Sequence, residues 1–393
     1  MKRFFQYASL LAAAVMLIAC EGKDPVADGA LTITSDKNLI QTFGGDYATL
    51  TVKLGSQVIT EGVTFFDSNN EVLEIVDFKF ATDKAGEYEI WANYGTYNSE
   101  MISIRAIDVA LPETPADPQP ENTKFKVRSL VTEFTTTGCS WCPSMKRVLH
   151  EVLADEAAAD MVVMSACHSS LVNTVADAAY IKTDYEDFSK STGMPYVFCD
   201  MYYGFGYYQT LTPTDVKSVF ADLNKSKEEI AAGIAVASRL EKDNIVAKVT
   251  VKAPKTANYR VGAFLLEDGI SAQQYNAGSD DWMHTHDDVI RYIDAQTFTN
   301  GKSQFYGHSL GEIKAGETAD YVFSWFLDQI WEKGSEACEI YGGGKPWAAR
   351  NDSKLHMAVF VSAIDVDDKG NQFYRVVNAI DCPINGETKF EYR

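Results

Sequence analysis

Strand-like and helix-like segments alternate between residues 125 and 223, and no other feature of this 393-residue chain constrains its fold more strongly. Short apolar runs predict strands at residues 125–135, 161–167 and 196–199. Apolar residues at helical spacing predict helices at residues 141–159, 175–189 and 214–223, the last with Thr212 or Thr214 as its N-cap. Alternating strands and helices imply a central sheet with helices on its faces.

On both sides of this α/β region, apolar and polar residues alternate at the spacing typical of strands. Residues 83–88 (DKAGEY) resemble the tyrosine corner of immunoglobulin-like sandwiches. We therefore predict an immunoglobulin-like β-sandwich at residues 30–108, with the role of a spacer. Residues 232–393 predict a second, larger β-sandwich, with hairpins around residues 242–244 and 367–371.

A proline-rich segment at residues 109–123 predicts an extended, semi-rigid linker and a domain boundary, because four prolines lie there among acidic residues. The predicted order is thus a β-sandwich at 30–108, the linker, an α/β domain at 124–231 and a β-sandwich at 232–393. Apolar residues make up 46% of the chain and aromatic residues 12%, which is enough to form these cores.

The N-terminus predicts export and lipid attachment. Lys2 and Arg3 precede an apolar run at residues 8–19, which is too short to span a bilayer comfortably. The run ends at Cys20 and resembles the lipobox of bacterial lipoproteins, which implies a signal peptide at 1–19, a tether at 20–29 and acylation of Cys20 on its thiol and its new amine. Glu21 is not the Asp associated with inner-membrane retention, so we expect the outer membrane, with the face left open. An ordinary secretory peptide is the alternative.

The net charge bears on the partners that the chain can bind. Fifty-five acidic residues outnumber thirty-five basic ones, which gives a formal charge of −20. A negative surface repels phosphate backbones, so we expect no nucleic-acid partner. The charge is consistent with a role in solubility.

Seven cysteines are present, and an exported chain holds them in an oxidising compartment. Cys139 and Cys142 form a C-x-x-C motif, and Cys338 and Cys382, which share the C-terminal region, are a candidate disulfide pair. Cys167 and Cys199 are consistent with buried small apolar residues.

The motif Cys139-Ser140-Trp141-Cys142 lies between a predicted strand and a predicted helix. The positive end of a helix favours a thiolate, and the pKa of a cysteine in such a motif falls from near 8.5 towards roughly 3.5–7.5. We therefore predict a redox disulfide, with Cys139 exposed as the nucleophile and Cys142 buried one turn further. A zinc site is less suitable because the chain has no second C-x-x-C pair, and an inert structural disulfide is the other alternative.

Residues 125–230 resemble the thioredoxin superfamily, on the strand, C-S-W-C, helix, strand, helix and Met194-Pro195 layout. The resemblance implies that Pro195 is a cis proline beside the motif and that Met194 pairs with an extended substrate strand, with Trp141 at the same substrate surface. It also implies that Glu133, six residues before Cys139, moves protons to and from Cys142. An ordinary strand residue is the alternative for Glu133.

The resemblance has further implications. The family's strand order separates Cys167 from Cys199, so no bridge between them is expected. Cys167 is either a third redox thiol or a packed strand-end residue. The motif itself departs from the family, because Thr137-Gly138 replaces the usual tryptophan before Cys139 and Ser140-Trp141 fills the centre. The direction of the redox reaction is therefore open.

The whole layout also resembles the Bacteroidota outer-membrane lipoprotein family named for a twenty-eight-kilodalton protein, including its histidine-rich segment at residues 282–291. Within that segment His284 and His286 are a candidate metal pair on one strand face, although a polar loop is the more common explanation. His308 and His356 are isolated in the sequence and predict structural roles. No cofactor is expected.

Two functions follow from these patterns. The first is a membrane-anchored thiol–disulfide oxidoreductase that acts on exported cysteine-containing proteins. The second is a non-catalytic surface lipoprotein whose β-sandwiches bind a glycan or a protein partner. The aromatic residues at 202–208 are consistent with such a binding surface or with a packed sheet edge.

Overall fold

The structure, a computed structural model, describes residues 29–168, 185, 187–191, 193–299, 302–341, 347–366, 369–370 and 372–393. The N-terminal segment with Cys20, and most of the helix predicted at 175–189, lie outside the described residues. The described chain is mostly β-sheet and forms two compact units, one ending at Ala106 and one from Ile107 to Arg393. None of the helices in these ranges is long and apolar enough to cross a membrane.

The first unit contains two sheets around one core. One sheet consists of β1 (Leu31–Ser35), β3 (Ala48–Leu54), β4 (Gln57–Ile59) and β7 (Lys79–Phe80). The other consists of β2 (Leu39–Gln41), β5 (Val63–Asp67), β6 (Val72–Leu73), β8 (Gly86–Tyr94), β9 (Tyr97–Asn98) and β10 (Ile102–Ile107). Val52 from the first sheet and Ile90 from the second lie in the same buried cluster. Tyr88 Oη donates a hydrogen bond to Lys84 O (2.9 Å), as the resemblance to a tyrosine corner implies.

The second unit is organised by a nine-stranded sheet with the order β14-β13-β11-β12-β20-β17-β25-β26, in which β23 also pairs with β17. The strands are β11 (Ser129–Thr135), β12 (Val162–His168), β13 (Tyr196–Cys199), β14 (Tyr203–Gly206), β17 (Ala257–Glu267), β20 (Val289–Asp294), β23 (His308–Ile313), β25 (Leu355–Val366) and β26 (Gln372–Pro383). β11 pairs in parallel with β12 and antiparallel with β13. The strands predicted at 125–135, 161–167 and 196–199 are confirmed as β11, β12 and β13.

The domain boundary predicted at residue 231 is wrong, because the nine-stranded sheet continues across it. β12 and β20 pair in parallel at Ala166 and Val289, and Ala166 N donates to Asp288 O (2.7 Å). This pairing covers an edge of β12 that would otherwise present free backbone groups. The region at 124–231 and the C-terminal strands therefore belong to one unit.

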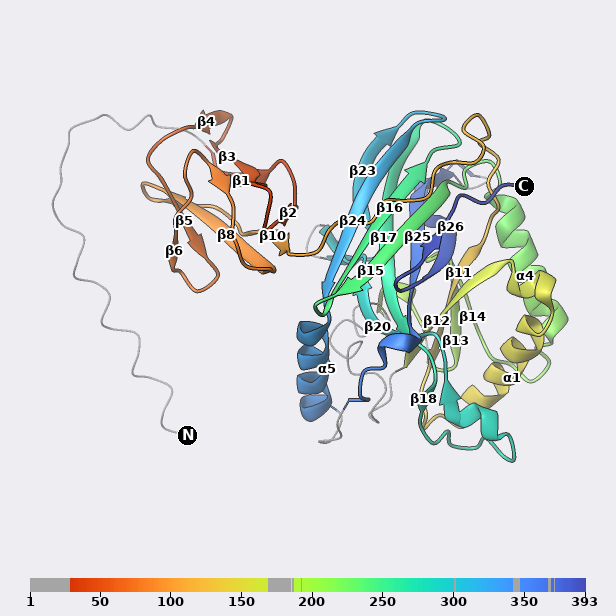
Figure 1. Cartoon of the computed structure of the whole chain (residues 1–393). Coiled ribbons are helices and arrows are strands. Elements are labelled where there is room, and N and C mark those ends of the chain that lie inside the picture. Colours follow the sequence, from red (N-terminus) through yellow and green to blue (C-terminus); the bar gives the residue numbers. More distant parts are fainter. Residues whose placement is uncertain are drawn as a thin grey trace. The chain divides into compact units, whose positions relative to one another are not determined.

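Helices α1 (Cys142–Leu153), α2 (Glu156–Ala159) and α4 (Pro213–Ser226) form one layer beside β11 to β14, where α1 and α4 lie side by side (Figure 1). The single helix predicted at 141–159 is interrupted because Asp155 accepts a hydrogen bond from Ala157 N and starts α2. Thr212 caps α4 in a capping box with Asp215, as one of the two predicted N-caps.

A second sheet, ordered β24-β16-β15-β27, covers the C-terminal part of the long sheet. Its strands are β15 (Gly233–Glu241), β16 (Asn244–Lys252), β24 (Thr318–Phe326) and β27 (Glu387–Thr388), and α5 (Leu327–Tyr341) follows β24. The hairpins predicted around residues 242–244 and 367–371 are confirmed as β15–β16 and β25–β26. Short elements complete the unit: β18 (Ile270–Ser271), η1 (Asp281–His284), β19 (Thr285–His286), β21 (Thr297–Thr299), β22 (Lys302–Gln304) and η2 (Asp352–Lys354).

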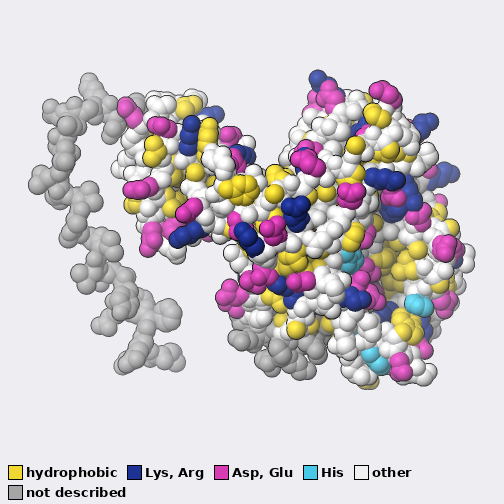
Figure 2. Space-filling model, viewed as in Figure 1, with side chains coloured by type: hydrophobic (Ala, Val, Ile, Leu, Met, Phe, Trp, Pro, Cys, Tyr) yellow, Lys and Arg dark blue, Asp and Glu magenta, His cyan; other side chains and the backbone are white. Residues whose placement is uncertain are grey.

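The proline-rich segment, residues 109–123, lies alongside β16 within the second unit. Thr114 Oγ1 hydrogen-bonds with Thr250 Oγ1 (2.8 Å), and Asp117 accepts from the buried Lys252 Nζ (2.7 Å). Thr250 and Lys252 are two positions apart on β16, so their side chains lie on the same face of the strand. On the face shown in Figure 2, acidic side chains are interspersed with Lys and Arg over this unit, a distribution consistent with solubility.

Candidate functional site

The C-x-x-C motif lies in the turn between β11 and α1. Cys139 and Cys142 form a disulfide with a Cα–Cα distance of 5.4 Å. Cys139 is partly exposed, whereas Cys142, the first residue of α1, is only 1% exposed. The partly exposed first cysteine and the buried second one agree with the arrangement that the motif predicts.

The N-terminus of α1 is directed at the Cys139 sulfur. Cys142 N lies 3.1 Å from Cys139 Sγ in a hydrogen-bond geometry, and no side chain caps the helix at Trp141. Backbone N–H groups at a helix N-terminus carry partial positive charge. When the disulfide is reduced, this environment favours the thiolate of Cys139 over the thiol.

The Met194–Pro195 peptide bond is cis and lies at the start of β13. In the antiparallel register Phe134 pairs with Tyr196, so the next position places Pro195 beside Thr135 at the end of β11. Cys139 follows four residues after Thr135. Strand pairing therefore brings the Met-Pro segment to the same end of the sheet as the C-x-x-C turn.

Glu133 lies inside the protein on β11, and only 8% of the residue is exposed. Its Oε1 atom has no hydrogen-bond partner among the described residues. Burial raises the pKa of this carboxyl to about 7, and the nearby Lys146 ammonium acts in the opposite direction. Lys146, on α1, has a pKa lowered by its own burial, and its Nζ donates to Thr285 O (2.8 Å).

Two buried histidines lie near Glu133 and Lys146, and no sequence pattern related these histidines to each other. His168 at the end of β12 and His286 in β19 have ring centroids 4.8 Å apart. Burial holds the pKa of His168 well below its usual value and lowers that of His286 to about 4, so both rings are neutral at pH 7. A histidine directly after the apolar run at 161–167 was the available signal for His168.

Replacing Glu133 with glutamine is expected to stabilise the folded protein at high pH. The carboxyl has a folded pKa near 7 against a reference of 4.5, so it contributes no cost below about pH 4.5, a cost that grows as pH rises from 4.5 to about 7, and its full cost above pH 7. The amide carries no charge, and we expect a gain of about 1 to 3 kcal/mol at about pH 8.5 and little change at about pH 4. Urea unfolding of the oxidised protein at both pH values measures this difference.

The matched control is Glu151→Gln, because Glu151 lies exposed on α1, the helix that carries Lys146. This variant should show no pH-dependent gain. An equal gain in both variants, or none at high pH for Glu133→Gln, would contradict the burial of an ionisable carboxyl at position 133.

A segment from the C-terminal part of the unit covers the C-x-x-C turn. Tyr275 N donates to Thr137 O (2.8 Å), and Asn276 Nδ2 donates to Ser140 O (2.9 Å). Arg147 on α1 forms an ion pair with Asp280 (2.8 Å). We call residues 272–286 the covering segment. It belongs to the region predicted as the C-terminal β-sandwich (232–393), whereas the motif belongs to the region predicted as the α/β domain (124–231). The site therefore contains residues from both predicted domains.

The same segment contains the metal pair that the sequence suggested, but the two histidines differ in position and environment. His284 ends η1, and its Nδ1 lies 3.0 Å from Gln274 N. His286 is buried in β19, and its Nε2 lies 3.1 Å from Ala272 O. Each ring is thus engaged by the backbone of the covering segment, and the prediction that both lie on one strand face is wrong.

Aromatic side chains lie around the exposed side of the motif. Trp141 is 52% exposed and stacks on Tyr207 with ring centroids 6.0 Å apart. Tyr275 of the covering segment is 63% exposed. Met194 is partly buried, and Pro195 is buried. Exposed aromatic surface next to a reactive sulfur is suited to contact a polypeptide.

The predicted disulfide between Cys338 and Cys382 is wrong, because Cys382 is a free, buried cysteine. Its sulfur lies 3.5 Å from the carbonyl oxygen of Pro383, the last residue of β26. It also lies 3.8 Å from the carbonyl oxygen of Gly386, in the turn that follows β26. Cys167 and Cys199 are both buried and are not bridged to each other, as expected. The burial of Cys167 agrees with a packed strand-end residue.

The comparisons with known proteins give little beyond this geometry. No protein-family model matches the sequence, and no curated protein sequence matches it. Among solved structures, the chain is similar to HBP35 of Porphyromonas gingivalis, with 14% sequence identity and a TM-score of 0.48. The similarity covers 67% of this chain and 77% of that chain.

Proposed function

We propose that this protein is a membrane-anchored thiol–disulfide oxidoreductase that acts on exported cysteine-containing proteins. The observation that carries the proposal is Cys139, a partly exposed residue whose sulfur is bonded to the buried Cys142 and lies at the N-terminus of α1. A structural disulfide does not require an accessible sulfur beside uncapped helix amides, whereas nucleophilic exchange does.

The fold that we propose for β11 to β14 with α1 and α4 is thioredoxin-like. The parallel β11–β12 pair, the antiparallel β13 that directly follows Met194-Pro195, and the helix that begins at Cys142 support it. For the first unit we propose an immunoglobulin-like sandwich, supported by its two sheets and the Tyr88–Lys84 hydrogen bond.

The proposed reaction transfers two electrons by two exchanges. The Cys139 thiolate attacks one sulfur of a substrate disulfide, forms a mixed disulfide and releases the other substrate sulfur as a thiolate. Cys142, once deprotonated, attacks the Cys139 sulfur, so the Cys139–Cys142 disulfide forms and the substrate leaves as a dithiol. The same steps in reverse oxidise a substrate dithiol, and a dithiol or disulfide partner restores the starting state.

Glu133 is suited to accept the proton that Cys142 loses. A base is most effective when its pKa lies near the working pH, and burial brings the Glu133 pKa to about 7. Its unpartnered Oε1 leaves an acceptor available inside the protein. Lys146 acts through Glu133 and is therefore a positioning residue, since its charge opposes the effect of burial.

The partners we propose follow from the compartment and from the surface near the sulfur. Lipid on Cys20 would hold the protein at the outer membrane, where exported proteins carry disulfides. An extended substrate segment would pair with the Met194 backbone and lie against Trp141. No nucleic acid and no cofactor take part in this proposal.

The pKa of the Cys139 thiol tests the proposal most directly. After reduction, the rate of alkylation of Cys139 against pH should report a pKa below about 8.5, the value of free cysteine. The reduced protein should also catalyse reduction of the insulin disulfides by a dithiol. A thiol pKa at or above about 8.5 together with no insulin reduction would reject the redox function.

A binding function is the second candidate, and the exposed tyrosines after β13 favour it. Tyr202, Tyr203 and Tyr208 are 49%, 43% and 51% exposed. Such rings stack on sugars or pack on a protein partner. Under this candidate, replacing Tyr203 and Tyr208 by alanine would remove binding to a glycan array or a partner, while the thiol assays would show no catalysis.

A further inference from the structure

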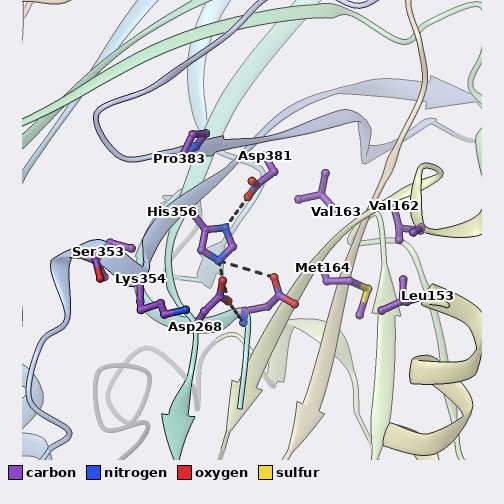
Figure 3. Close-up of a pocket in the computed structure, with 13 residues that line it drawn as sticks. Leu153, Val162, Val163, Met164, Asp268, Ser353, Lys354, His356, Asp381 and Pro383 are labelled. Atoms are coloured by element: carbon purple, nitrogen blue, oxygen red, sulfur yellow. Dashed lines mark hydrogen bonds and ion pairs between the residues drawn. The ribbon is translucent and has the colours of Figure 1, made fainter. Parts of the chain in front are cut away.

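Four side chains that are distant in sequence converge at the far end of α1 from the C-x-x-C turn (Figure 3). Asp268 follows β17, Asp288 precedes β20, His356 is in β25 and Asp381 is in β26. Donor atoms of Asp268, Asp288 and His356 all lie within 4.8 Å of one another. Leu153, the last residue of α1, lines the same cavity, about 16 Å along the helix from Cys142.

The His356 ring is oriented as a metal-binding histidine would be. Its Nδ1 lies 2.6 Å from Asp381 Oδ1, and its Nε2 faces the carboxylates of Asp268 (3.3 Å) and Asp288 (3.8 Å). The Nε2 atom is buried and makes no hydrogen bond of suitable geometry with the described residues. A carboxylate on one ring nitrogen commonly fixes the other nitrogen for a metal ion.

The space in front of these groups is open enough for an ion and its remaining ligands. The cavity has a volume of about 590 Å³. One wall is apolar, with Leu153, Val162 and Met164, and the other carries the aspartates and His356, as Figure 3 shows. Three protein donors on one side leave further coordination positions that face the cavity.

The charges of the cluster also call for a cation. Asp268, Asp288 and Asp381 surround His356, and Lys354 is the basic residue that lines the cavity with them. Three aspartates against one lysine and one imidazole leave an excess of negative charge at this end of the cavity, which a cation offsets.

We propose that Asp268, Asp288 and His356 form a binding site for one divalent transition-metal ion of the zinc type, with Asp381 orienting the imidazole. One imidazole nitrogen and two carboxylates suit zinc-type ions, whereas Mg²⁺ and Ca²⁺ prefer oxygen ligands alone. The site is independent of the disulfide, because Cys139 and Cys142 contribute no ligand to it.

The test is calorimetric titration of the oxidised protein with Zn²⁺, since the closed disulfide keeps Cys139 and Cys142 from binding the metal. We expect one equivalent of Zn²⁺ to bind and the melting temperature to rise with its concentration. Mg²⁺ at the same concentrations should give neither effect. Absence of saturable Zn²⁺ binding would overturn the proposal.

The decisive variant is Asp288→Asn. Because Asn keeps the size of the side chain and tolerates the positive φ of 56° at this position, the fold should persist. We expect Zn²⁺ affinity to fall at least about tenfold and the melting temperature to lose its dependence on Zn²⁺. His356→Gln should abolish binding, and Asp381→Asn should weaken it by about ten- to a hundredfold.

His284→Gln is the matched control, because His284 belongs to the histidine pair that the sequence suggested for a metal. This variant should bind Zn²⁺ as the wild type does. Loss of binding in His284→Gln with retention in Asp288→Asn would place the metal at the covering segment and overturn the proposal. Equal binding by all variants would mean surface binding only and would overturn it as well.

Discussion

Cys139→Ser is expected to reduce insulin-disulfide turnover at least about a hundredfold, because a serine hydroxyl is not ionised at neutral pH and cannot attack a disulfide. The N-terminus of α1 and the Cys142 amide stabilise a negative sulfur at position 139 but not a neutral hydroxyl. Turnover by the reduced protein with a dithiol reductant measures the loss. Cys382→Ala, which changes a buried thiol remote from the motif in the sequence, should retain activity.

Cys142→Ser gives a distinguishable result, because it retains the attacking sulfur and lacks the resolving one. Cys139 should then accumulate as a mixed disulfide with its substrates, which are released by reductant and identified by mass spectrometry. Full turnover by Cys139→Ser, or no covalent adduct with Cys142→Ser, would contradict the order of attack assigned to the two sulfurs.

The largest expected effect on stability comes from Asp200→Asn. Asp200 accepts from Lys227 Nζ (2.6 Å) and from Leu130 N (3.0 Å), and both side chains of the ion pair are fully buried. The amide retains the shape of the side chain but leaves the buried ammonium without its counterion. Breaking such a pair from one side costs about 3 to 5 kcal/mol. Urea unfolding of the oxidised wild type and variant at pH 7 measures the change.

A double variant and a surface pair provide the controls. Asp200→Asn combined with Lys227→Met removes both charges and should recover much of the lost stability. Lys242→Met breaks the exposed Lys242–Asp108 pair and should cost less than about 1 kcal/mol. A loss from Asp200→Asn as small as that from Lys242→Met would show that the buried pair does not stabilise this end of β13.

The sequence predicted the local elements well where one physical signal decides them. Apolar runs identified β11, β12 and β13, and Thr212 identified the start of α4. The pairing of β12 with β20 was not predictable in this way, since periodicity says which face of a strand is buried but not which distant strand lies beside it. The predicted boundary at residue 231 failed for this reason.

The same contrast between local sequence signals and distant contacts applies to the candidate site. Cys139 and Cys142 are close in sequence, so their position between a strand and a helix was enough to relate them, and the resemblance to the thioredoxin superfamily added Glu133. The covering segment reaches Thr137 and Ser140 from more than a hundred residues away, and the isolated His356 gave no sign of its three aspartates. Clusters assembled by loops at the ends of non-neighbouring strands carry no fixed spacing that a motif could capture.

The contact between Asn276 and Ser140 spans 136 positions of the chain, and this separation has a consequence for the export that we propose. During export the C-x-x-C turn emerges long before residues 272–286 and β20 do. We expect the nascent chain to present both thiols uncovered, open to oxidation or to other secreted polypeptides, until the C-terminal strands have crossed the membrane. The covering of the two thiols would then be complete only after the whole chain has crossed the membrane.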